Sequence, residues 1–392
     1  MLFRSSHQQA FRDAGPGVIS MAAGMSVRVA GDVILSAASI GTVDRPIVLQ
    51  TETSGFTTAN ASSGGIYLRN IGDETRTSRF DLNAPTAQVV SLDAVDNDLV
   101  IDSNPSFASN TVNLALSAPR GVLKISDEII HSGTITLLGN SGVTILSNVI
   151  GTGNVSVTSN GAIQVNGATV ASSAGTLTVT GPSLQVNGAS APAGLSGTQG
   201  AQLAIAGDVS VTGGAGSAFL GGSGGVCTGS IGGNLALSGG SGANATATLF
   251  GSPDVGSAAS PLRIGGTITF QNGAGANAVA RIAAAEPDSV FINFPNLTSG
   301  GYTVNGVAVT SLDGSGFYAD GLPAILGDNL HITYGDGSTY NNGVPVFAAG
   351  AVEVQAVDAA LAAVQPFLRP ELPYPWPEKD LPLPSDGLAV CQ

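Results

Sequence analysis

The chain has 392 residues, of which 55 are glycine and only 10% are charged, and its formal net charge is −14. The 13 basic residues are scattered, which excludes the basic patch of a phosphate-backbone binder, and a 43% apolar content excludes a disordered acidic tail. Gly, Ser, Thr, Val, Ala and Asn take the place of the Leu, Glu, Lys and Arg that a helical bundle requires, so the composition predicts an all-β, turn-dense protein.

A lead segment at residues 1–24 precedes the first repeat. It contains Arg4 and Arg12 but no apolar core of roughly 7–15 residues after them, so no secretory signal peptide is predicted. Gly, Ser or Asn interrupts the longest apolar runs well before the roughly 20 residues that a membrane-spanning helix requires. The sequence therefore predicts no transmembrane segment.

Residues 25–299 are predicted to form the shaft of a β-solenoid, with its clearest repeats at 122–211 and 205–282. In the first region, short segments of alternating apolar and polar residues recur about every 20 residues, and Asn and Gly between them suit tight corners. One series begins at Val122, Val143, Ile163, Leu184 and Leu203, and a second, between them, begins at Ile135, Val155, Leu177 and Val209. This regularity favours stacked parallel coils over the main alternative, an antiparallel sandwich of Asn-Gly hairpins.

The second region carries a clearer repeat, of the form Ile-small-Gly-polar followed by an alternating segment and a glycine-rich loop. Its copies begin at Ile205, Ile231 and Ile264, and a partial copy begins at Val29. The changing distance between the copies predicts coils joined by loops of different lengths.

Three further segments are predicted towards the C-terminus. Residues 300–350 are richer in Tyr and Phe, and we expect a β-rich unit that caps the solenoid. Residues 351–365 lack Gly and Pro and are rich in Ala, which predicts a short helix. Residues 366–392 form a Pro-rich, extended tail.

The acidic stretch that begins at Asp93 is the main candidate for chemistry. Asp96 and Asp98, two residues apart, are expected on one strand face, and they are the best catalytic carboxylates if the chain cleaves a polysaccharide. Asp93, Asp96 and Asp98 are also the candidate calcium ligands. The competing interpretation is ordinary turn carboxylates on a solvated edge, and the next basic residue along the chain is Arg120.

Little else in the sequence indicates catalysis or a cofactor. Between residues 129 and 253 the only charged side chain is Asp208, so no sugar-cleaving groove is predicted there. The three histidines are expected at the surface or in loops, and Cys227, assigned to a glycine loop, and Cys391 are expected to be free thiols. Two cysteines and separated histidines do not predict a zinc site. The sequence thus predicts no resident metal, no cofactor and no enzymatic activity.

The repeat Gly-Asp-Val-Ser-Val-Thr-Gly-Gly at 207–214, the Asn-Gly corners, the acidic composition and the Pro-rich tail resemble large exoproteins of the filamentous haemagglutinin type. The resemblance covers residues 25–350 and corresponds to the C-terminal part of such a protein, without the N-terminal secretion domain. It implies a right-handed parallel β-helix that acts as an adhesin in the extracellular space or on the bacterial outer surface.

The resemblance also implies partners. A longer exoprotein of this type is exported by two-partner secretion through an outer-membrane transporter, and its shaft contacts a glycan, matrix or cell-surface ligand. No adhesive motif is defined for the family, so no binding residue is carried over, and no nucleic-acid partner is expected. Two alternatives stay open: a β-helical polysaccharide lyase or hydrolase, and a nonfunctional remnant of a larger exoprotein gene.

Overall fold

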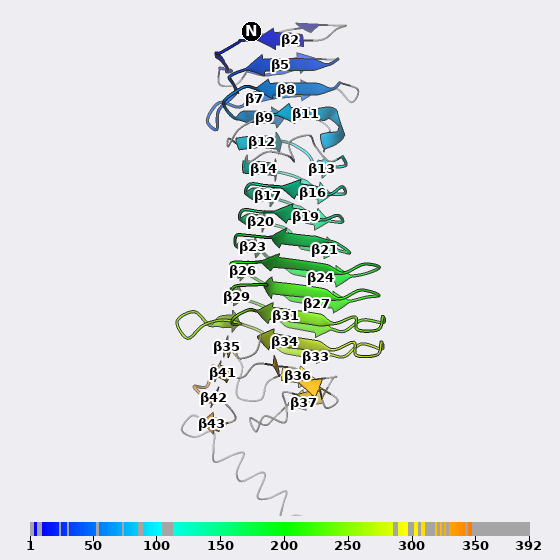
Figure 1. Ribbon diagram of the computed structural model, residues 1–392, viewed down its shortest axis with the longest axis vertical. Helices are drawn as coiled ribbons and strands as arrows, with labels where there is room; N and C mark the ends of the chain where they lie inside the picture. The colour runs from blue at the N-terminus through cyan, green and yellow to red at the C-terminus, as the bar shows by residue number, and fades with distance from the viewer. Residues whose placement is uncertain are drawn as a thin grey trace, which may run out of the picture. The chain divides into compact units, whose positions relative to one another are not determined.

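A computed structural model shows short β-strands stacked as coils (Figure 1). It describes residues 4–5, 10–22, 25–29, 31–51, 55–72, 74–84, 89–103, 113–284, 289–296, 302–304, 307–309, 318–319, 322–323, 325–326, 329–341 and 344–346. The predicted helix at 351–365, the tail at 366–392 and Cys391 lie outside these residues. In the described part, the only helical segment is the 3-10 turn η1 (Thr77–Arg79), and no helix is long and apolar enough to span a membrane.

In the middle of the stack each coil has three sides. The chain passes through β17 (Ile135–Gly139), β18 (Gly142–Ile145) and β19 (Val149–Gly151), then returns to the first side at β20 (Val155–Ser159). Each strand pairs in parallel with its equivalent in the next coil. This confirms the predicted parallel β-solenoid and excludes the antiparallel sandwich.

We name the sheets on the three sides A, C and D, and a fourth sheet, B, takes the third place in the N-terminal coils. Sheet A contains β1 (Arg4–Ser5), β3 (Val18–Ile19), β4 (Val27–Val29), β6 (Ser39–Ile40), β7 (Ile47–Thr51), β9 (Ile66–Asn70), β12 (Val89–Ala94), β14 (Asn113–Ala118), β17, β20, β23 (Leu177–Gly181), β26 (Ala201–Ile205), β29 (Cys227–Ile231), β32 (Leu262–Ile264), β35 (Ser289–Phe294), β41 (Asn329–Tyr334), β42 (Thr339–Asn341) and β43 (Val344–Val346). Sheet B contains β2 (Ala10–Asp13), β5 (Val33–Ala37), β8 (Thr57–Ala61) and β11 (Phe80–Asn83).

The other two large sheets follow the same order along the chain. Sheet C contains β10 (Thr75–Arg76), β13 (Leu99–Ile101), β15 (Val122–Ile125), β18, β21 (Ile163–Asn166), β24 (Leu184–Gly188), β27 (Val209–Gly213), β30 (Leu235–Ser238), β33 (Ile268–Gln271), β36 (Tyr302–Val304) and β37 (Val307–Val309). Sheet D contains β16 (Ile129–His131), β19, β22 (Thr169–Ser172), β25 (Ala193–Gly197), β28 (Ala218–Gly222), β31 (Ala247–Gly251), β34 (Ala280–Ala284) and β40 (Ile325–Leu326). A small separate sheet pairs β38 (Tyr318–Ala319) with β39 (Leu322–Pro323).

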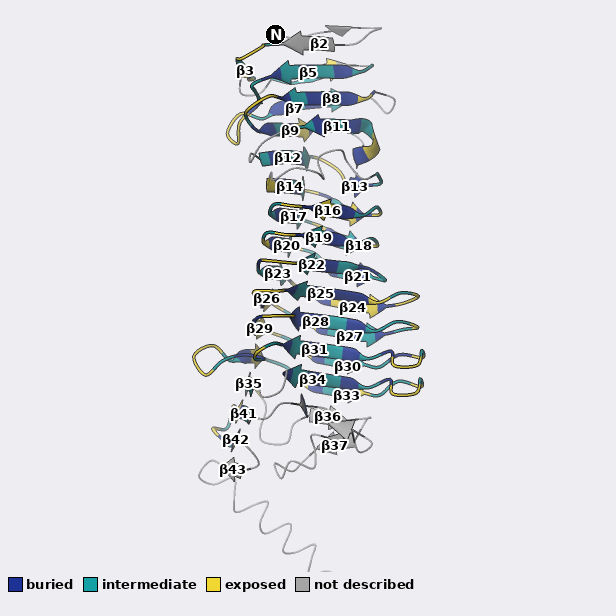
Figure 2. Cartoon of the chain, in the orientation of Figure 1, coloured by how far each residue is buried: buried dark blue, intermediate teal, exposed yellow. Residues whose placement is uncertain are grey.

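The core is a set of apolar columns that run from coil to coil inside the stack. In most strands whose burial is described, alternate residues point inward and are buried, as the burial colours of Figure 2 show. Ile205, Ile231 and Ile264, which begin the copies of the 205–282 repeat, are register partners at the ends of neighbouring sheet A strands. The repeat therefore marks equivalent positions of the coil although its spacing changes.

The two predicted series of segments need one correction. Leu203 lies on β26 of sheet A, beside Val179, whereas Val209 begins β27 of sheet C, beside Leu184. Leu203 therefore belongs to the second predicted series and Val209 to the first. The cause is β25, a strand made largely of small residues without clear alternation, because such a strand hides the greater length of its coil in the sequence.

Glycine is abundant because the backbones of successive coils meet at the corners. At Gly200, the backbone φ is +118°, a region that other residues rarely adopt. A Cβ atom at this position would lie only 2.8 Å from the carbonyl oxygen of Val226 in the next coil. Glycine satisfies both constraints.

Parallel pairing extends past both limits of the shaft predicted at 25–299. Near the N-terminus, β1 pairs with β4 and β3 with β6, and beyond residue 299 β41 continues sheet A next to β35. The pairing then becomes antiparallel, between β41, β42 and β43 and between β36 and β37. Antiparallel strands thus follow the last parallel strands of sheets A and C.

The inward columns should dominate stability. We expect Leu237→Ala, which truncates a buried side chain on β30, to lower the free energy of unfolding by about 2–5 kcal/mol. Ser238→Ala, on the outward position next to it, should change it by less than about 0.5 kcal/mol. Urea denaturation followed by circular dichroism measures both, and equal effects would contradict this assignment of the core.

Candidate functional site

Asp93 occupies an outward position on β12. In the parallel ladder its register partner on β9 is Arg69, and Arg69 Nε lies 3.2 Å from Asp93 Oδ2. On the other side its partner is Ser117 of β14. Burial raises the pKa of Asp93, while hydrogen bonds from Arg69 and Ser117 and the charge of Arg69 oppose that rise.

Asp96 and Asp98 lie in the turn between β12 and β13 and are exposed. The expectation that they share a strand face is therefore wrong, because the strand ends at Ala94. Asp96 Oδ1 lies 2.7 Å from Arg120 Nη1, and Asp98 Oδ1 accepts a 2.8 Å hydrogen bond from the backbone N–H of Val122. Arg120 is distant in sequence but belongs to the neighbouring coil.

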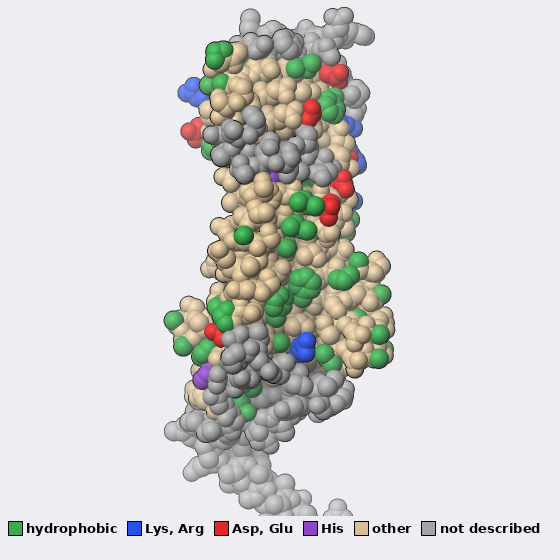
Figure 3. Space-filling model, in the orientation of Figure 1, with side chains coloured by type: hydrophobic (Ala, Val, Ile, Leu, Met, Phe, Trp, Pro, Cys, Tyr) green, Lys and Arg blue, Asp and Glu red, His purple; other side chains and the backbone are tan. Residues whose placement is uncertain are grey.

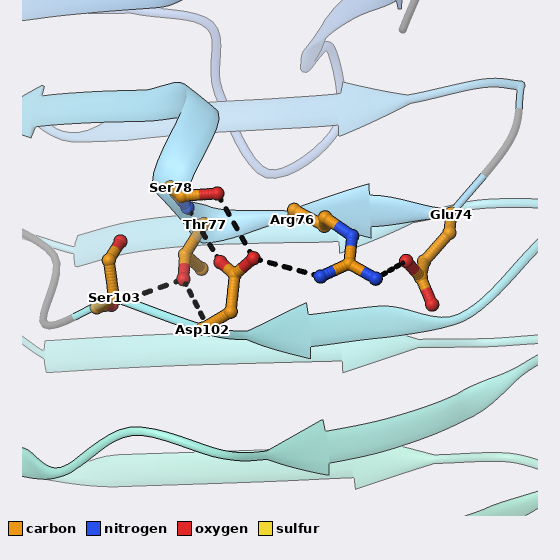
Figure 4. Close-up of polar contacts among 6 residues, drawn as sticks. All are labelled: Glu74, Arg76, Thr77, Ser78, Asp102 and Ser103. Carbon is orange, nitrogen blue, oxygen red and sulfur yellow. Dashed lines mark hydrogen bonds and ion pairs between the residues drawn. The ribbon is translucent and has the colours of Figure 1, made fainter.

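Asp102 is the centre of a polar cluster that links two neighbouring coils (Figure 4). Its carboxylate accepts hydrogen bonds from the backbone N–H of Ser78 (2.9 Å), the Ser78 hydroxyl (3.0 Å) and Arg76 Nη1 (3.1 Å). Arg76 also pairs with Glu74, and the Thr77 hydroxyl donates to the carbonyl of Ser103. Partial burial raises the pKa of Asp102, but the hydrogen bonds from Ser78 and Arg76 and the charge of Arg76 outweigh it, so the net pKa lies below its usual value.

These four carboxylates connect neighbouring coils and do not converge on one point. Asp93 and Asp96 are bound to guanidinium groups on different coils, and among the described residues no group of three or more His, Cys, Asp or Glu side chains could hold a metal ion. The structure therefore does not assemble Asp93, Asp96 and Asp98 into a calcium site.

Sequence analysis missed the partners of these carboxylates. Each partner lies one coil away, at a separation of 24 residues for Arg69–Asp93, Asp96–Arg120 and Ser78–Asp102. The usable signal was a charged or hydroxyl side chain at one coil length from each aspartate. The residues next to each aspartate in the sequence do not reveal it, because one coil of 24 residues separates the partners.

The following coils carry an uncharged outer surface, which we call the uncharged band (residues 132–253). Its only charged side chain, Asp208, accepts a 2.7 Å hydrogen bond from the backbone N–H of Asn234 in the next coil. On sheet C, hydroxyl and amide side chains form two outward columns that follow the strand register: Thr144, Gln164, Gln185 and Ser210, and Asn166, Asn187, Thr212 and Ser238. Figure 3 shows that, on the face in view, the middle coils display neither acidic nor basic side chains.

Two side chains, those of His131 and Cys227, lie in other places than the sequence predicts. His131, expected at the surface or in a loop, is 1% exposed and is the last residue of β16. Cys227, assigned to a glycine loop, is a buried free thiol at the start of β29, where it occupies a core column with Ala201. Burial raises the pKa of Cys227 to about 12, so it is not a reactive thiol.

Comparison with known proteins adds no functional assignment. No protein family, no curated protein and no solved structure matches the chain. A β-solenoid is compatible with several roles, so function has to be argued from the outer surface of the coils.

The Asp102 cluster predicts an acid-sensitive contribution to stability. The folded-state pKa of Asp102 is lowered, so its contribution is complete above the unfolded pKa of about 3.9 and is lost as the pH falls through the folded value. We expect Asp102→Asn to lower the free energy of unfolding by about 1–2 kcal/mol at pH 7 and by much less at pH 3. Urea midpoints across this range test it, and a difference between variant and native protein that does not depend on pH would contradict it.

For Asp93, we expect ionisation to affect the free energy of unfolding in the opposite direction to that of Asp102. Its folded-state pKa is raised, so the ionised carboxylate opposes folding at neutral pH, and this penalty disappears below the unfolded pKa of about 3.9. We expect Asp93→Asn to leave stability unchanged or to raise it by up to about 0.5 kcal/mol at pH 7. Urea midpoints of Asp93→Asn and Asp102→Asn are measured together, with Asp102→Asn as the control. If Asp93→Asn lost as much stability as Asp102→Asn, the contact with Arg69 would outweigh the cost of burial, and the prediction would be wrong.

Proposed function

We propose that this chain is an adhesive shaft that works outside the cell, on a bacterial surface or in secreted form, where it contacts a glycan, matrix or cell-surface ligand. The observation that carries the proposal is the uncharged band, in which successive coils repeat hydroxyl and amide side chains at outward positions. Parallel strands place these side chains about 4.8 Å apart along the stack.

Such a surface suits many weak contacts made together. Hydroxyl and amide groups both donate and accept hydrogen bonds, and a rigid array of them gains avidity when one extended ligand contacts several coils. The net charge of −14 and the lack of Lys and Arg in the uncharged band favour an uncharged ligand over a polyanion.

Catalysis is less well supported than adhesion. A polysaccharide-cleaving β-helix needs carboxylates that face the substrate, whereas Asp93, Asp96 and Asp98 are engaged by neighbouring coils. We therefore propose a non-enzymatic role. If the chain belongs to a longer exoprotein of the filamentous haemagglutinin type, export through an outer-membrane two-partner transporter is part of the same proposal.

The proposal predicts binding that resists salt. We expect the purified full chain to bind at least one member of a panel of neutral polysaccharides, matrix proteins and whole cells. Raising NaCl from 50 to 500 mM should change the affinity less than about threefold, because an uncharged surface releases no counterions. Biolayer interferometry measures this, with heparin and polygalacturonate as polyanion controls that should not bind.

Two outcomes would contradict the proposal. One is failure to bind any member of the panel. The other is confinement of the native product to the cytoplasm, tested by blotting fractionated source cells with an antibody raised against residues 366–392. A surface or culture-medium signal agrees with the proposal.

A further inference from the structure

Two phenylalanines lie on the outer face of sheet D, in neighbouring coils. Phe219 on β28 and Phe250 on β31 both occupy outward positions, and their ring centroids are 6.0 Å apart at an interplanar angle of 61°. The adjacent inward positions hold Leu220 and Leu249, which are fully buried. The rings are therefore additional to the core, on strands whose core positions are already filled. We call Phe219 and Phe250 the phenyl pair.

The ring of Phe219 lies flat on the backbone of the preceding coil. Its register partner on β25 is Gly194, and the three atoms nearest to a Cβ built at Gly194 all belong to the Phe219 ring, at nearly equal distances. Equal distances to three neighbouring ring atoms require the face of the ring, and not its edge, to cover the glycine. Any side chain at residue 194 would displace the ring, so this glycine makes room for a flat aromatic surface.

Polar groups surround the phenyl pair. Thr248 separates Phe219 from Arg281 in one column of the register, and Ser196 lies in the column of Phe250. Arg281 Nε is shielded from solvent and has no hydrogen-bond partner, so it is a buried donor without an acceptor. A ligand oxygen cannot reach this shielded nitrogen, but Arg281 is partly exposed, and the terminal nitrogens of its guanidinium carry further N–H donors for a ligand oxygen.

We propose that the phenyl pair, together with Thr248 and Arg281, is a binding subsite for the pyranose ring of a neutral polysaccharide. One face of a pyranose is a patch of C–H groups that packs on an aromatic face, and its rim carries hydroxyl groups that accept and donate hydrogen bonds. The inference rests on the proposed adhesive function and names the ligand class and the place where it binds.

Other occupants fit less well. A stable protein interface needs roughly 800 Å² from each partner, far more than two phenyl rings and their small polar neighbours provide. A polyanion would meet only two cations, Arg263 and Arg281, between Lys124 and residue 346. The uncharged surface next to a single guanidinium instead matches a neutral ring with hydroxyl oxygens.

The test is isothermal titration calorimetry of the full chain with cellohexaose and chitohexaose, neutral pyranose oligomers of two kinds. We expect native protein to bind at least one of them, Phe219→Ala to bind it at least tenfold more weakly and Phe219→Tyr to bind it within about threefold of native. Gly194→Val should also weaken binding, because it displaces the ring without removing it. Ile130→Ala, which changes a half-exposed apolar side chain on the same sheet far from the phenyl pair, is the matched control and should bind as native.

The outcomes separate this inference from the proposed function. Native affinity in Phe219→Ala, with an unchanged circular-dichroism spectrum, overturns the subsite but leaves the adhesive function in place. Binding to matrix protein or cells without binding to either oligomer does the same. A dimer of the native chain that Phe219→Ala converts to monomer in sedimentation, with no sugar bound, would assign the phenyl pair to self-association and also overturn it. Failure of native protein to bind the whole panel overturns both.

Discussion

The parallel backbone ladder between successive coils determines the neighbours of every residue in the shaft. A side chain meets residues one coil before and one coil after it, and within its own strand it shares a face only with residues two positions away. The ion pairs of Asp93 and Asp96 and the hydrogen bond accepted by Asp98 all follow this rule. Acidic residues that form a cluster in the sequence therefore separate into individual links between coils.

The same rule explains how much could be predicted from the sequence. Alternation of apolar and polar residues is a local signal, so the strands, the solenoid and the equivalence of Ile205 and Ile231 could be predicted. Neighbours across coils depend on coil length, which is not local. Sheet A partners are 20 residues apart at Ile135 and Val155, whereas sheet C partners are 33 apart at Leu235 and Ile268. The exchange of Leu203 with Val209 and the unrecognised partners of the aspartates have this common cause.

Coil length varies without disturbing the core because the additional residues lie at corners. The loops between β30 and β31 and between β33 and β34 extend beyond the strands (Figure 1) and stack on each other. Asn277 Nδ2 donates to Asn244 Oδ1 at 3.1 Å, and both residues adopt a positive φ, near +57° and +59°. Asparagine tolerates this conformation better than most residues. The loops thus repeat one local structure, while the strands beneath keep their register.

Because the ladder constrains the inward and corner positions, the outward positions are those whose side chains can vary with function. Most inward positions are apolar, with a few buried polar residues such as Thr57 and His131, and corner positions must be small or able to turn, whatever the protein does. Serine, threonine, asparagine or glutamine at an outward position satisfies the ladder at no cost to the core. An outward phenylalanine is not required by the fold, and Phe270, buried on β33, shows that the core accepts this side chain where it is needed. The outward rings of Phe219 and Phe250 pack on each other and on Gly194, and the proposed contact with a ligand would use the faces that this packing leaves open.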